Sequence, residues 1–305
     1  MTDKILISVV GPTAIGKTAL GIKIANYFDT EIISADSRQF FKEMNIGTAV
    51  PDPEELLAAK HHFIQHISIE DHYSVGDFEK EAISKISELF LDHDVVVLVG
   101  GSGLYVKSII EGLDDFPDIN PEIRKELNEI LNNEGLKPLQ KKLKHLDPEY
   151  FANADIENPH RIIRALEICM GTGKKFSSFR SQKKSQRDFK TIEIGLKADR
   201  QIIYDRINKR VDLMMQAGLL EEAKNLYPKK HLNALNTVGY KELFSYIDNE
   251  IALDFAISEI KKNTRHFAKR QLTWFRKNDN IHWFDYQTKP EKINAFISEE
   301  LKKLQ

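Results

Sequence analysis

The sequence predicts an α/β protein in which helices flank a parallel sheet and a helical domain is inserted between sheet segments. Two units of apolar strand, glycine-rich turn and helix predict the sheet, one at residues 5–25 and one at 94–105. A proline-marked change to strongly charged helical sequence near residue 117 predicts the insertion. At 305 residues the chain is long enough for one large or two modest domains.

The first unit carries the most specific motif of the chain. The apolar run 5–10 is followed by a Gly-x-x-x-x-Gly-Lys-Thr pattern, which a helical segment then continues. Glycines let backbone N–H groups turn toward phosphate oxygens, the lysine neutralises charge and the threonine hydroxyl can bind Mg²⁺. A chance glycine turn is the alternative, and the flanking strand and helix argue against it. The pattern predicts a P-loop NTPase-like core, with a phosphate loop formed by Gly11, Pro12, Thr13, Ala14, Ile15, Gly16, Lys17 and Thr18.

Asp36 follows a second short apolar run, at residues 32–33. Ligands bind at the carboxyl ends of strands in open parallel sheets, so we expect Asp36 to lie near Lys17. The alternative is that Asp36 only caps a following helix. The run 95–99 reads as a central strand and ends at Gly100, where nucleotide hydrolases often have a Mg²⁺-binding aspartate. That difference argues weakly against a hydrolase.

Between these strands lie a histidine cluster and an amphipathic segment. His61, His62, His66 and His72 could include a metal site, because residues 62 and 66 share a helical spacing. They lack the glutamate and cysteine partners of zinc motifs, so we interpret them as packed or surface histidines. Residues 73–90 have apolar side chains at helical spacing and predict a helix.

The expected domains are a catalytic core at 1–116 and 191–305 and a helical insertion at 117–190. The end of the insertion, 171–190, is rich in Lys and Arg, typical either of a phosphate-binding segment or of a solvated loop. A strand is expected at 191–196, a helix from Asp199 to near Gly218, and a turn at 236–241. The segment 264–277 predicts a helix in which cations surround Trp274, which suits nucleic acid, although Trp274 could instead be a core residue.

Composition limits the class of protein. The net charge of −2 argues against a globally basic nucleic-acid binder but allows a local basic patch. Cys169 is the single cysteine, so no intramolecular disulfide can form. No apolar run reaches membrane-spanning length, and the first strand begins too early for a signal peptide. We expect a soluble, cytoplasmic protein.

Together the motifs resemble those of bacterial tRNA dimethylallyltransferases, and the resemblance extends over essentially the whole chain. The motifs are weak or moderate one by one, but their order is specific. They are the phosphate loop with Asp36-Ser37-x-Gln39, Ile46-Gly47-Thr48-Ala49-x-Pro51, His61-His62, Tyr73-Ser74-x-x-Asp77-Phe78, residues 100–105 (GGSGLY), residues 158–167 (NPHRIIRALE), Val238-Gly239-Tyr240-Lys241 and residues 269–274 (KRQLTW).

The resemblance implies transfer of a dimethylallyl group from dimethylallyl diphosphate to N6 of adenosine 37 in tRNA, without ATP. It implies that the phosphate loop, Arg210 and Mg²⁺ on Thr18 stabilise the departing diphosphate. Asp36 matches the carboxylate that accepts the proton from N6. Ser102 stands where the family usually has threonine. Lys17 and Thr18 complete the implied catalytic set.

The resemblance also implies binding of the tRNA anticodon stem-loop by a monomer, with the adenine turned out of its stack. The implied contacts, besides Asp36 and Ser102, are Ser37, Arg38, Gln39, Arg124, His160, Arg161, Ile162, Ile163, Arg164, Asn236, Gly239, Tyr240, Lys241, Lys269, Arg270, Gln271, Trp274 and Arg276. Val50 replaces a family lysine, which weakens the expectation of RNA contacts at 45–51, while Ile15, Phe40-Phe41-Lys42 and His160 are further departures.

Three other functions remain open from the sequence. A P-loop kinase of a nucleoside or small metabolite would use Asp36 as its base and would require ATP. A non-catalytic nucleotide switch or RNA-binding module would not depend on Asp36. An adenylate isopentenyltransferase would act on free AMP, but the long insertion and the basic C-terminal helix favour tRNA.

Overall fold

A computed structural model describes residues 4–180 and 186–304. The chain divides into two compact units, here called the core unit (1–111 and 187–305) and the helical unit (112–186). Both boundaries lie a few residues before the expected positions 117 and 190. Phe116 stacks on Phe176 at 5.0 Å, which places it with the helical unit. Arg187 belongs to the core unit, because its guanidinium donates to the carbonyls of Ser108 and Ile109 and to Glu79.

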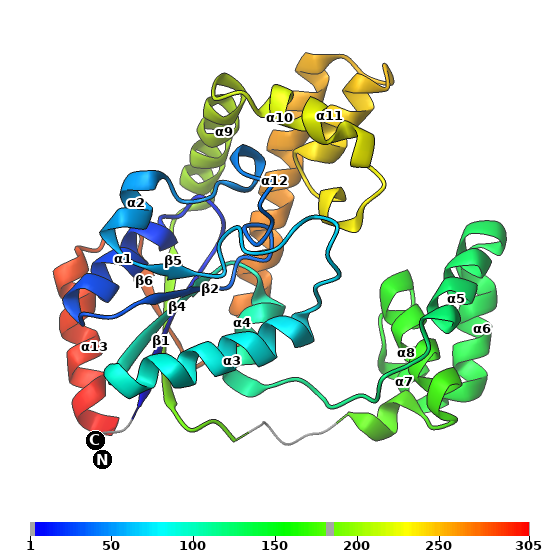
Figure 1. Cartoon of the computed structure of the whole chain (residues 1–305), viewed down its shortest axis with the longest axis horizontal. Helices are drawn as coiled ribbons and strands as arrows, with labels where there is room; N and C mark the ends of the chain where they lie inside the picture. Colours follow the sequence, from blue (N-terminus) through cyan, green and yellow to red (C-terminus); the bar gives the residue numbers. More distant parts are fainter. Residues whose placement is uncertain (1–3, 181–185, 305) are drawn as a thin grey trace. The chain divides into compact units, whose positions relative to one another are not determined.

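A parallel sheet forms the centre of the core unit (Figure 1). Its six strands within the described residues run in the order β3-β2-β4-β1-β5-β6. They are β1 (Ile5–Val10), β2 (Ile32–Ser34), β3 (His61–His62), β4 (Val95–Gly100), β5 (Lys190–Lys197) and β6 (Ile281–Asp285). Because all pairings are parallel, the segments after β1, β2 and β4 emerge at one edge of the sheet.

Helices cover both faces of this sheet. The helices of the core unit are α1 (Lys17–Tyr27), α2 (Pro53–Ala58), α3 (Val75–Asp92), α4 (Gly103–Glu111), α9 (Arg200–Gln216), α10 (Leu219–Leu226), α11 (Tyr240–Ile247), α12 (Leu253–Phe275) and α13 (Pro290–Leu304), with 3-10 turns η1 (Ile46–Thr48), η3 (Tyr227–Lys229) and η4 (Asn233–Leu235). Alternate residues of β1 enter two cores: Ile7 and Val9 pack with α1, α9 and α13, whereas Leu6 and Val10 pack with α3 and α4.

A third core joins α9, α10, α11 and α12 beyond the sheet. The helix expected at 264–277 is the second half of α12, which is longer than predicted and ends at Phe275. Buried Ala256 and Ile260 extend its apolar face one turn at a time toward the N-terminus, so the helix begins at Leu253. The helix expected from Asp199 is present as α9, and the helix expected at 73–90 is α3.

Strands β3 and β6 have no counterpart in the sequence-based expectations. β3 pairs His61 and His62 with Ile32 and Ile33, so two histidines stand on an edge strand. The Nε2 atom of His62 lies 2.5 Å from a carboxylate oxygen of Glu31. No group of three or more His, Cys, Asp or Glu residues is placed to hold a metal in 4–180 or 186–304. Both histidines are half-buried, and the Nδ1 atom of His61 lies 2.8 Å from the carbonyl oxygen of Ala59.

The helical unit has its own core. Its elements are α5 (Pro121–Glu134), α6 (Leu136–Leu146), α7 (Pro148–Asn153), α8 (Pro159–Thr172) and η2 (Phe176–Phe179). Leu127, Leu139 and Leu166 are fully buried there. The carboxylate of Asp147, also buried, accepts hydrogen bonds from the backbone of Tyr150 and from Ser177, and so ties α7 to η2. Lys183 and Lys184 of the basic segment lie outside the described residues.

Candidate active site

The predicted phosphate loop connects β1 to α1. Gly11 and Gly16 have φ angles of 145° and 108°, in the region that favours glycine. A Cβ atom on Gly11 would lie 2.8 Å from the carbonyl oxygen of Leu196, so β5 leaves no room for a side chain. The Nζ atom of Lys17 donates to the carbonyl of Pro12 at 2.9 Å and thereby crosses the loop. The loop is compact, and the N-terminus of α1 lies directly behind it.

A cavity of about 270 Å³, here called the loop cavity, opens at this loop. Lys17, Arg206 and Arg210 supply cations to its wall, and Thr18 supplies a hydroxyl. The remaining lining residues are Thr13, Ala14, Gly16, Ala19, Ser34, Asp36, Gln39, Thr48, Ala49, Pro51, Glu55, His61, Ile64, Val99 and Gly100. Cations and backbone donors at one wall make the cavity suited to a multiply charged anion.

Burial and mutual repulsion lower the pKa of Lys17 and of Arg210. The pKa of Lys17 is lowered from 10.5 to about 8, mainly by burial. The charge of Asp36 raises this pKa, and the charge of Arg210 lowers it. The pKa of Arg210 is also lowered, by burial first and by Arg206 second. Both shifts indicate excess positive charge in a poorly solvated place, which an anionic ligand would relieve.

Arg206 belongs to the cavity although the sequence analysis gave it no role. Its Nε atom donates to the carbonyl of Ala14 at 2.6 Å, and its guanidinium lies over the ring of Tyr286 at 5.4 Å. The spacing of four residues between Arg206 and Arg210 places both on one face of α9. That spacing was the sequence signal that could have identified it.

Asp36 lies just after β2, at the edge where the loop cavity opens. Its Oδ1 atom accepts a hydrogen bond from the backbone N–H of Arg38 at 3.2 Å, and its carbonyl accepts one from Gln39. The residues that follow form turns, so the alternative that Asp36 caps a helix is wrong. The structure brings Asp36 into the same cavity as Lys17, as the order of strands predicted.

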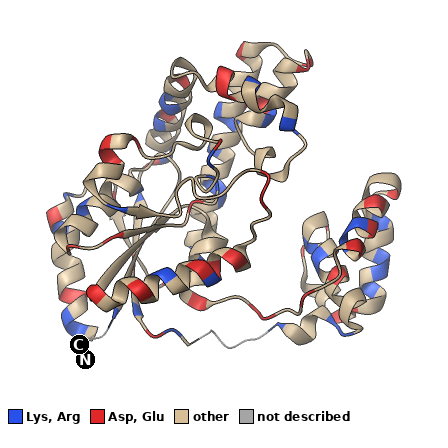
Figure 2. Cartoon of the chain, in the orientation of Figure 1, with Lys and Arg blue, Asp and Glu red and all other residues tan. Residues whose placement is uncertain are grey.

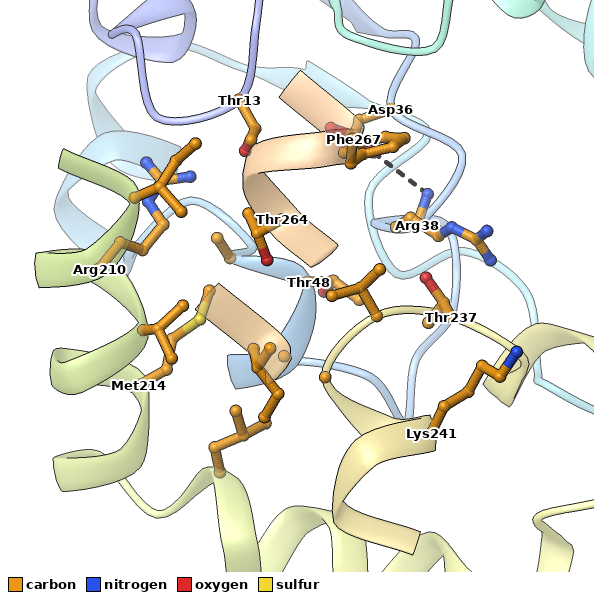
Figure 3. A pocket seen from close by; sticks show the side chains of 18 of the residues that line it. Thr13, Asp36, Arg38, Thr48, Arg210, Met214, Thr237, Lys241, Thr264 and Phe267 are labelled. Atoms are coloured by element: carbon orange, nitrogen blue, oxygen red, sulfur yellow. Dashed lines mark hydrogen bonds between the residues drawn. The ribbon is translucent and has the colours of Figure 1, made fainter. Parts of the chain in front are cut away.

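A second cavity of about 330 Å³, drawn in Figure 3, shares Asp36 with the loop cavity as a lining residue. Thr13, Thr48, Ala49 and Arg210 also line both. The other walls of the second cavity are apolar toward α9 and mixed polar and apolar toward the segment 236–241 and α12. They comprise Arg38, Gly47, Ile207, Val211, Met214, Leu219, Asn236, Thr237, Val238, Gly239, Lys241, Ile260, Thr264, Phe267 and Arg270. The carboxylate of Asp36 therefore lies between the loop cavity, which is lined by cations, and the second cavity, which is partly apolar.

The glycine turn after β4 packs tightly against the segment that follows β2. A Cβ atom on Gly100 would lie 2.4 Å from the carbonyl oxygen of Ala35, so the aspartate that nucleotide hydrolases often have at this position would not fit here. The Oγ atom of Ser102 accepts from the backbone N–H of Ser37 at 3.1 Å and lies 3.1 Å from its hydroxyl. Ser102 therefore supports the turn that holds Asp36.

Residues predicted to contact tRNA in the core unit differ in exposure. Half-buried are Asp36, Ser37, Arg38, Gln39 and Ser102. Lys269, Arg270, Arg276, Lys241, Asn236 and Trp274 are exposed, the last to 41%. Tyr240, Gly239 and Gln271 are buried. The Gln271 side chain accepts from the backbone N–H of Thr13 at 2.8 Å and donates to the carbonyl of Gly101 at 2.9 Å. Tyr240 and Gln271 pack inside because their polar groups have protein partners, and their contact with RNA stays a prediction.

In the helical unit, too, some of the residues predicted to contact tRNA are exposed and others are buried. Ile162 and Ile163 are buried on α8, and their predicted contact with RNA stays a prediction. Arg124 and Arg164 share the buried carboxylate of Glu167, each at 2.8–2.9 Å, and keep exposed edges. His160 and Arg161 are exposed at the start of α8. Figure 2 shows that this unit carries cations and anions interspersed on its helices.

Fold and site together define a P-loop NTPase-like α/β protein with cations and a carboxylate at the cavity beside its phosphate-loop motif, joined to a helical unit. Residues 39–278 match the family described as IPP transferase, and the chain belongs to that family. No helix in the described part of the chain is long and apolar enough to cross a membrane.

Curated relatives match over nearly their whole length. The tRNA dimethylallyltransferase of Christiangramia forsetii is 67% identical over 97% of this chain and 98% of its own. That of Flavobacterium johnsoniae is 58% identical over 98% and 99%.

Solved structures show the same fold. The tRNA isopentenylpyrophosphate transferase of Bacillus halodurans is 37% identical, with a TM-score of 0.74, over 99% of this chain and 97% of its own. A eukaryotic dimethylallyltransferase acting on tRNA is 25% identical, with a TM-score of 0.81, over 97% and 80%.

Proposed function

We propose that this chain transfers the dimethylallyl group of dimethylallyl diphosphate to N6 of adenosine 37 in tRNA, with release of diphosphate. The names of the relatives support transfer of a dimethylallyl group to tRNA. The observation that carries the proposal is the meeting of two cavities at Asp36, one lined by cations and one partly apolar.

The loop cavity would hold the diphosphate. As the allylic C–O bond breaks, negative charge grows on the departing oxygen, and fixed donors stabilise it most where water is excluded. The backbone of the phosphate loop, Lys17 and Arg210 supply such donors. Arg206, braced by Ala14 and Tyr286, adds a third cation to this wall. We include it in the proposed diphosphate site.

The adenine would enter through the second cavity and present N6 to Asp36. The lone pair of N6 is delocalised into the ring, so the amine is a weak nucleophile and must lose a proton when it is alkylated. A carboxylate within hydrogen-bond reach can accept that proton. Asp36 can do so because it lines both cavities, beside the diphosphate and beside the space for the base.

A divalent metal fits the oxygen donors of the loop cavity, where Thr18 and Asp36 both line the wall. We propose Mg²⁺ on the Thr18 hydroxyl, because Mg²⁺ prefers oxygen ligands and completes its shell with phosphate oxygens and water. Its chemistry there would be neutralisation of diphosphate charge. Thr18 would hold the ion, while Lys17 and Arg210 bind the remaining phosphate charge.

The exposed residues of α12 and the segment 236–241 would bind the anticodon stem-loop of the tRNA. Lys269 and Arg270 are exposed cations, and Trp274 offers an aromatic face, a combination typical of surfaces for single-stranded loops. The adenine would leave its stack to reach the second cavity. We further propose that the helical unit, 112–186, holds the stem through exposed Arg124, His160, Arg161 and Arg164, and that the protein acts as a monomer.

The other functions considered from the sequence gain no support from the relatives, whose names describe tRNA transferases. The decisive test incubates the protein with unmodified tRNA, labelled dimethylallyl diphosphate and Mg²⁺, and analyses the digested RNA. We expect N6-dimethylallyl adenosine, formed without ATP and lost when EDTA removes the divalent metal. Labelled AMP in a parallel reaction, or phosphate transfer from ATP, would instead support an adenylate isopentenyltransferase or a kinase.

A double substitution tests the RNA surface. Lys269→Ala with Arg270→Ala is expected to weaken tRNA binding and to reduce the slope of log Kd against log[salt] by about two phosphate contacts. The measurement is a salt titration of tRNA binding by filter retention. Lys289→Ala with Lys292→Ala, near the start of α13, removes equal charge elsewhere and is the matched control. Equal slopes in all three proteins would place the RNA surface elsewhere.

A further inference from the structure

Glu222 on α10 binds four donors with one carboxylate. Its oxygens accept the backbone N–H groups of Asn45, Ile46 and Gly47 at 3.1, 2.8 and 2.9 Å. The hydroxyl of Tyr240 donates to the same group at 2.7 Å. Three successive backbone N–H groups that converge on one point form an anion-binding concavity. In this protein its anion is the side chain of Glu222.

The segment held by Glu222, residues 44–49, has no room to move toward Tyr240. A Cβ atom on Gly47 would lie 2.6 Å from the ring and hydroxyl of Tyr240, which is itself fully buried. The turn is closed on its other side by the Thr48 hydroxyl, which donates to the carbonyl of Met44 at 2.8 Å. Glu222 and Tyr240 therefore fix this segment from α10 and α11.

The same segment reaches Asp36 through one side chain. Gln39 donates from its amide to the carbonyl of Ala49 at 2.7 Å and to that of Thr48 at 3.3 Å. The backbone N–H of Gln39 in turn donates to the carbonyl of Asp36 at 3.0 Å. Thr48 and Ala49 also line both cavities, at the place where they meet. A shift of the segment would therefore change both the junction and the turn that carries Asp36.

We propose that Glu222 is a positioning residue for the transfer reaction: by binding the N–H groups of residues 45–47 it holds Thr48, Ala49 and Gln39 so that Asp36 faces the junction of the two cavities. The inference rests on the proposed function. A carboxylate is required because all four partners are donors. An amide at this place would turn its own N–H₂ group toward at least one of them, so Glu222→Gln keeps the shape and loses the acceptor.

The test compares Glu222→Gln with Glu221→Gln. Glu221 is the adjacent exposed residue, which forms an ion pair with Lys224 at 2.8 Å, and serves as the matched control. We expect Glu222→Gln to lower kcat by about 10–100-fold, because a displacement near 1 Å can cost that much in a positioned reaction. The KM for dimethylallyl diphosphate should stay within about threefold, since the phosphate loop and Arg210 are unchanged. A general loss of structure would instead lower the melting temperature and the fraction of active protein, with kcat per active site unaltered.

A second substitution displaces residues 44–49 without changing Glu222, so the test does not depend on a single variant. Gly47→Ala pushes against Tyr240 while Glu222 stays intact, and should reproduce the loss in kcat. In the double variant Glu222→Gln/Gly47→Ala the two losses should not multiply, because both act through one segment. A Glu222→Gln enzyme that equals Glu221→Gln, or a double variant whose losses multiply, would overturn the proposal.

Hydrogen exchange separates this inference from the proposed function. Glu222→Gln should speed exchange of the amides of residues 45–47 by about tenfold or more, while Glu221→Gln leaves it unchanged. If the amides of residues 45–47 exchange no faster in Glu222→Gln than in the wild type, Glu222 does not hold this segment, even if the enzyme is active. Absence of prenylated adenosine with the wild-type chain would overturn the proposed function and, with it, the role in positioning, even if the exchange result showed that Glu222 holds the segment.

Discussion

Asp36→Asn is expected to lower kcat by about 10²–10⁴-fold, the range for loss of a positioned general base, while tRNA binding stays close to that of the wild type. The amide retains an oxygen for the backbone N–H of Arg38, so the turn after β2 should persist. What it loses is the ability to accept the proton from N6. The measurement is single-turnover prenylation at saturating tRNA and dimethylallyl diphosphate, with tRNA binding determined separately.

The charge of Asp36 also acts on its neighbours, and this effect must be separated from proton transfer. Asp36 raises the pKa of Lys17, Arg38 and Arg210 against the lowering caused by burial. In Asp36→Asn the pKa of Lys17 should therefore fall further. At pH 6.5 Lys17 is more fully charged than at pH 8.5, so an indirect effect would shrink at the lower pH. A defect that persists at pH 6.5 supports the base.

A substitution just after the C-terminal end of α1, far from the phosphate loop, provides the control. Asp29→Asn changes an exposed aspartate at the opposite edge of the sheet and should leave the rate unchanged. Wild-type turnover in Asp36→Asn would remove Asp36 from the role of base. Weakened tRNA binding with normal single-turnover rates would move Asp36 to recognition of the base alone.

The core of the site could be predicted because it depends on strand order and local backbone chemistry. The phosphate loop needs glycine at positions with positive φ, and Asp36 follows a strand adjacent in the sheet to β4. Both features are encoded within a few residues. Ser102 follows β4 at the same edge of the sheet, and its hydroxyl contacts the turn that carries Asp36.

Residues that act through distant contacts were harder to predict. Tyr240 and Gln271 lie in motifs that suggested RNA contacts, yet their polar atoms meet Glu222 on α10 and the phosphate loop, far away in the sequence. Glu222 itself sits in an ordinary amphipathic helix, and no local pattern marks its three backbone partners. Strand β6 alternates weakly and contains His282, so its place beside β5 depended on tertiary packing.

Lys17→Met is expected to reduce kcat/KM for dimethylallyl diphosphate by about 10²–10³-fold, comparable to removal of one fixed donor to a developing negative charge. Burial has lowered the pKa of Lys17 to about 8, so the ammonium is charged below that pH and becomes neutral as the pH rises through it. In the wild type, kcat/KM should therefore fall as the pH rises through about 8. In Lys17→Met this fall should be absent, whereas in Lys23→Met, an exposed lysine on the same helix, it should remain.

The same substitution should raise the thermal stability of the protein near pH 7. In the folded state the charged form of Lys17 is disfavoured, while in the unfolded chain it keeps its proton up to about 10.5. Between about pH 8 and 10.5 the unfolded state binds more protons, so the cost of burying the charge is complete below pH 8 and disappears as the pH rises. Methionine removes that cost at neutral pH. A higher melting temperature combined with lost activity would show that the charged Lys17 lowers the stability of the folded protein and serves to bind the ligand. A Lys17→Met protein with wild-type kcat/KM would instead show that the phosphate loop binds diphosphate without this side chain.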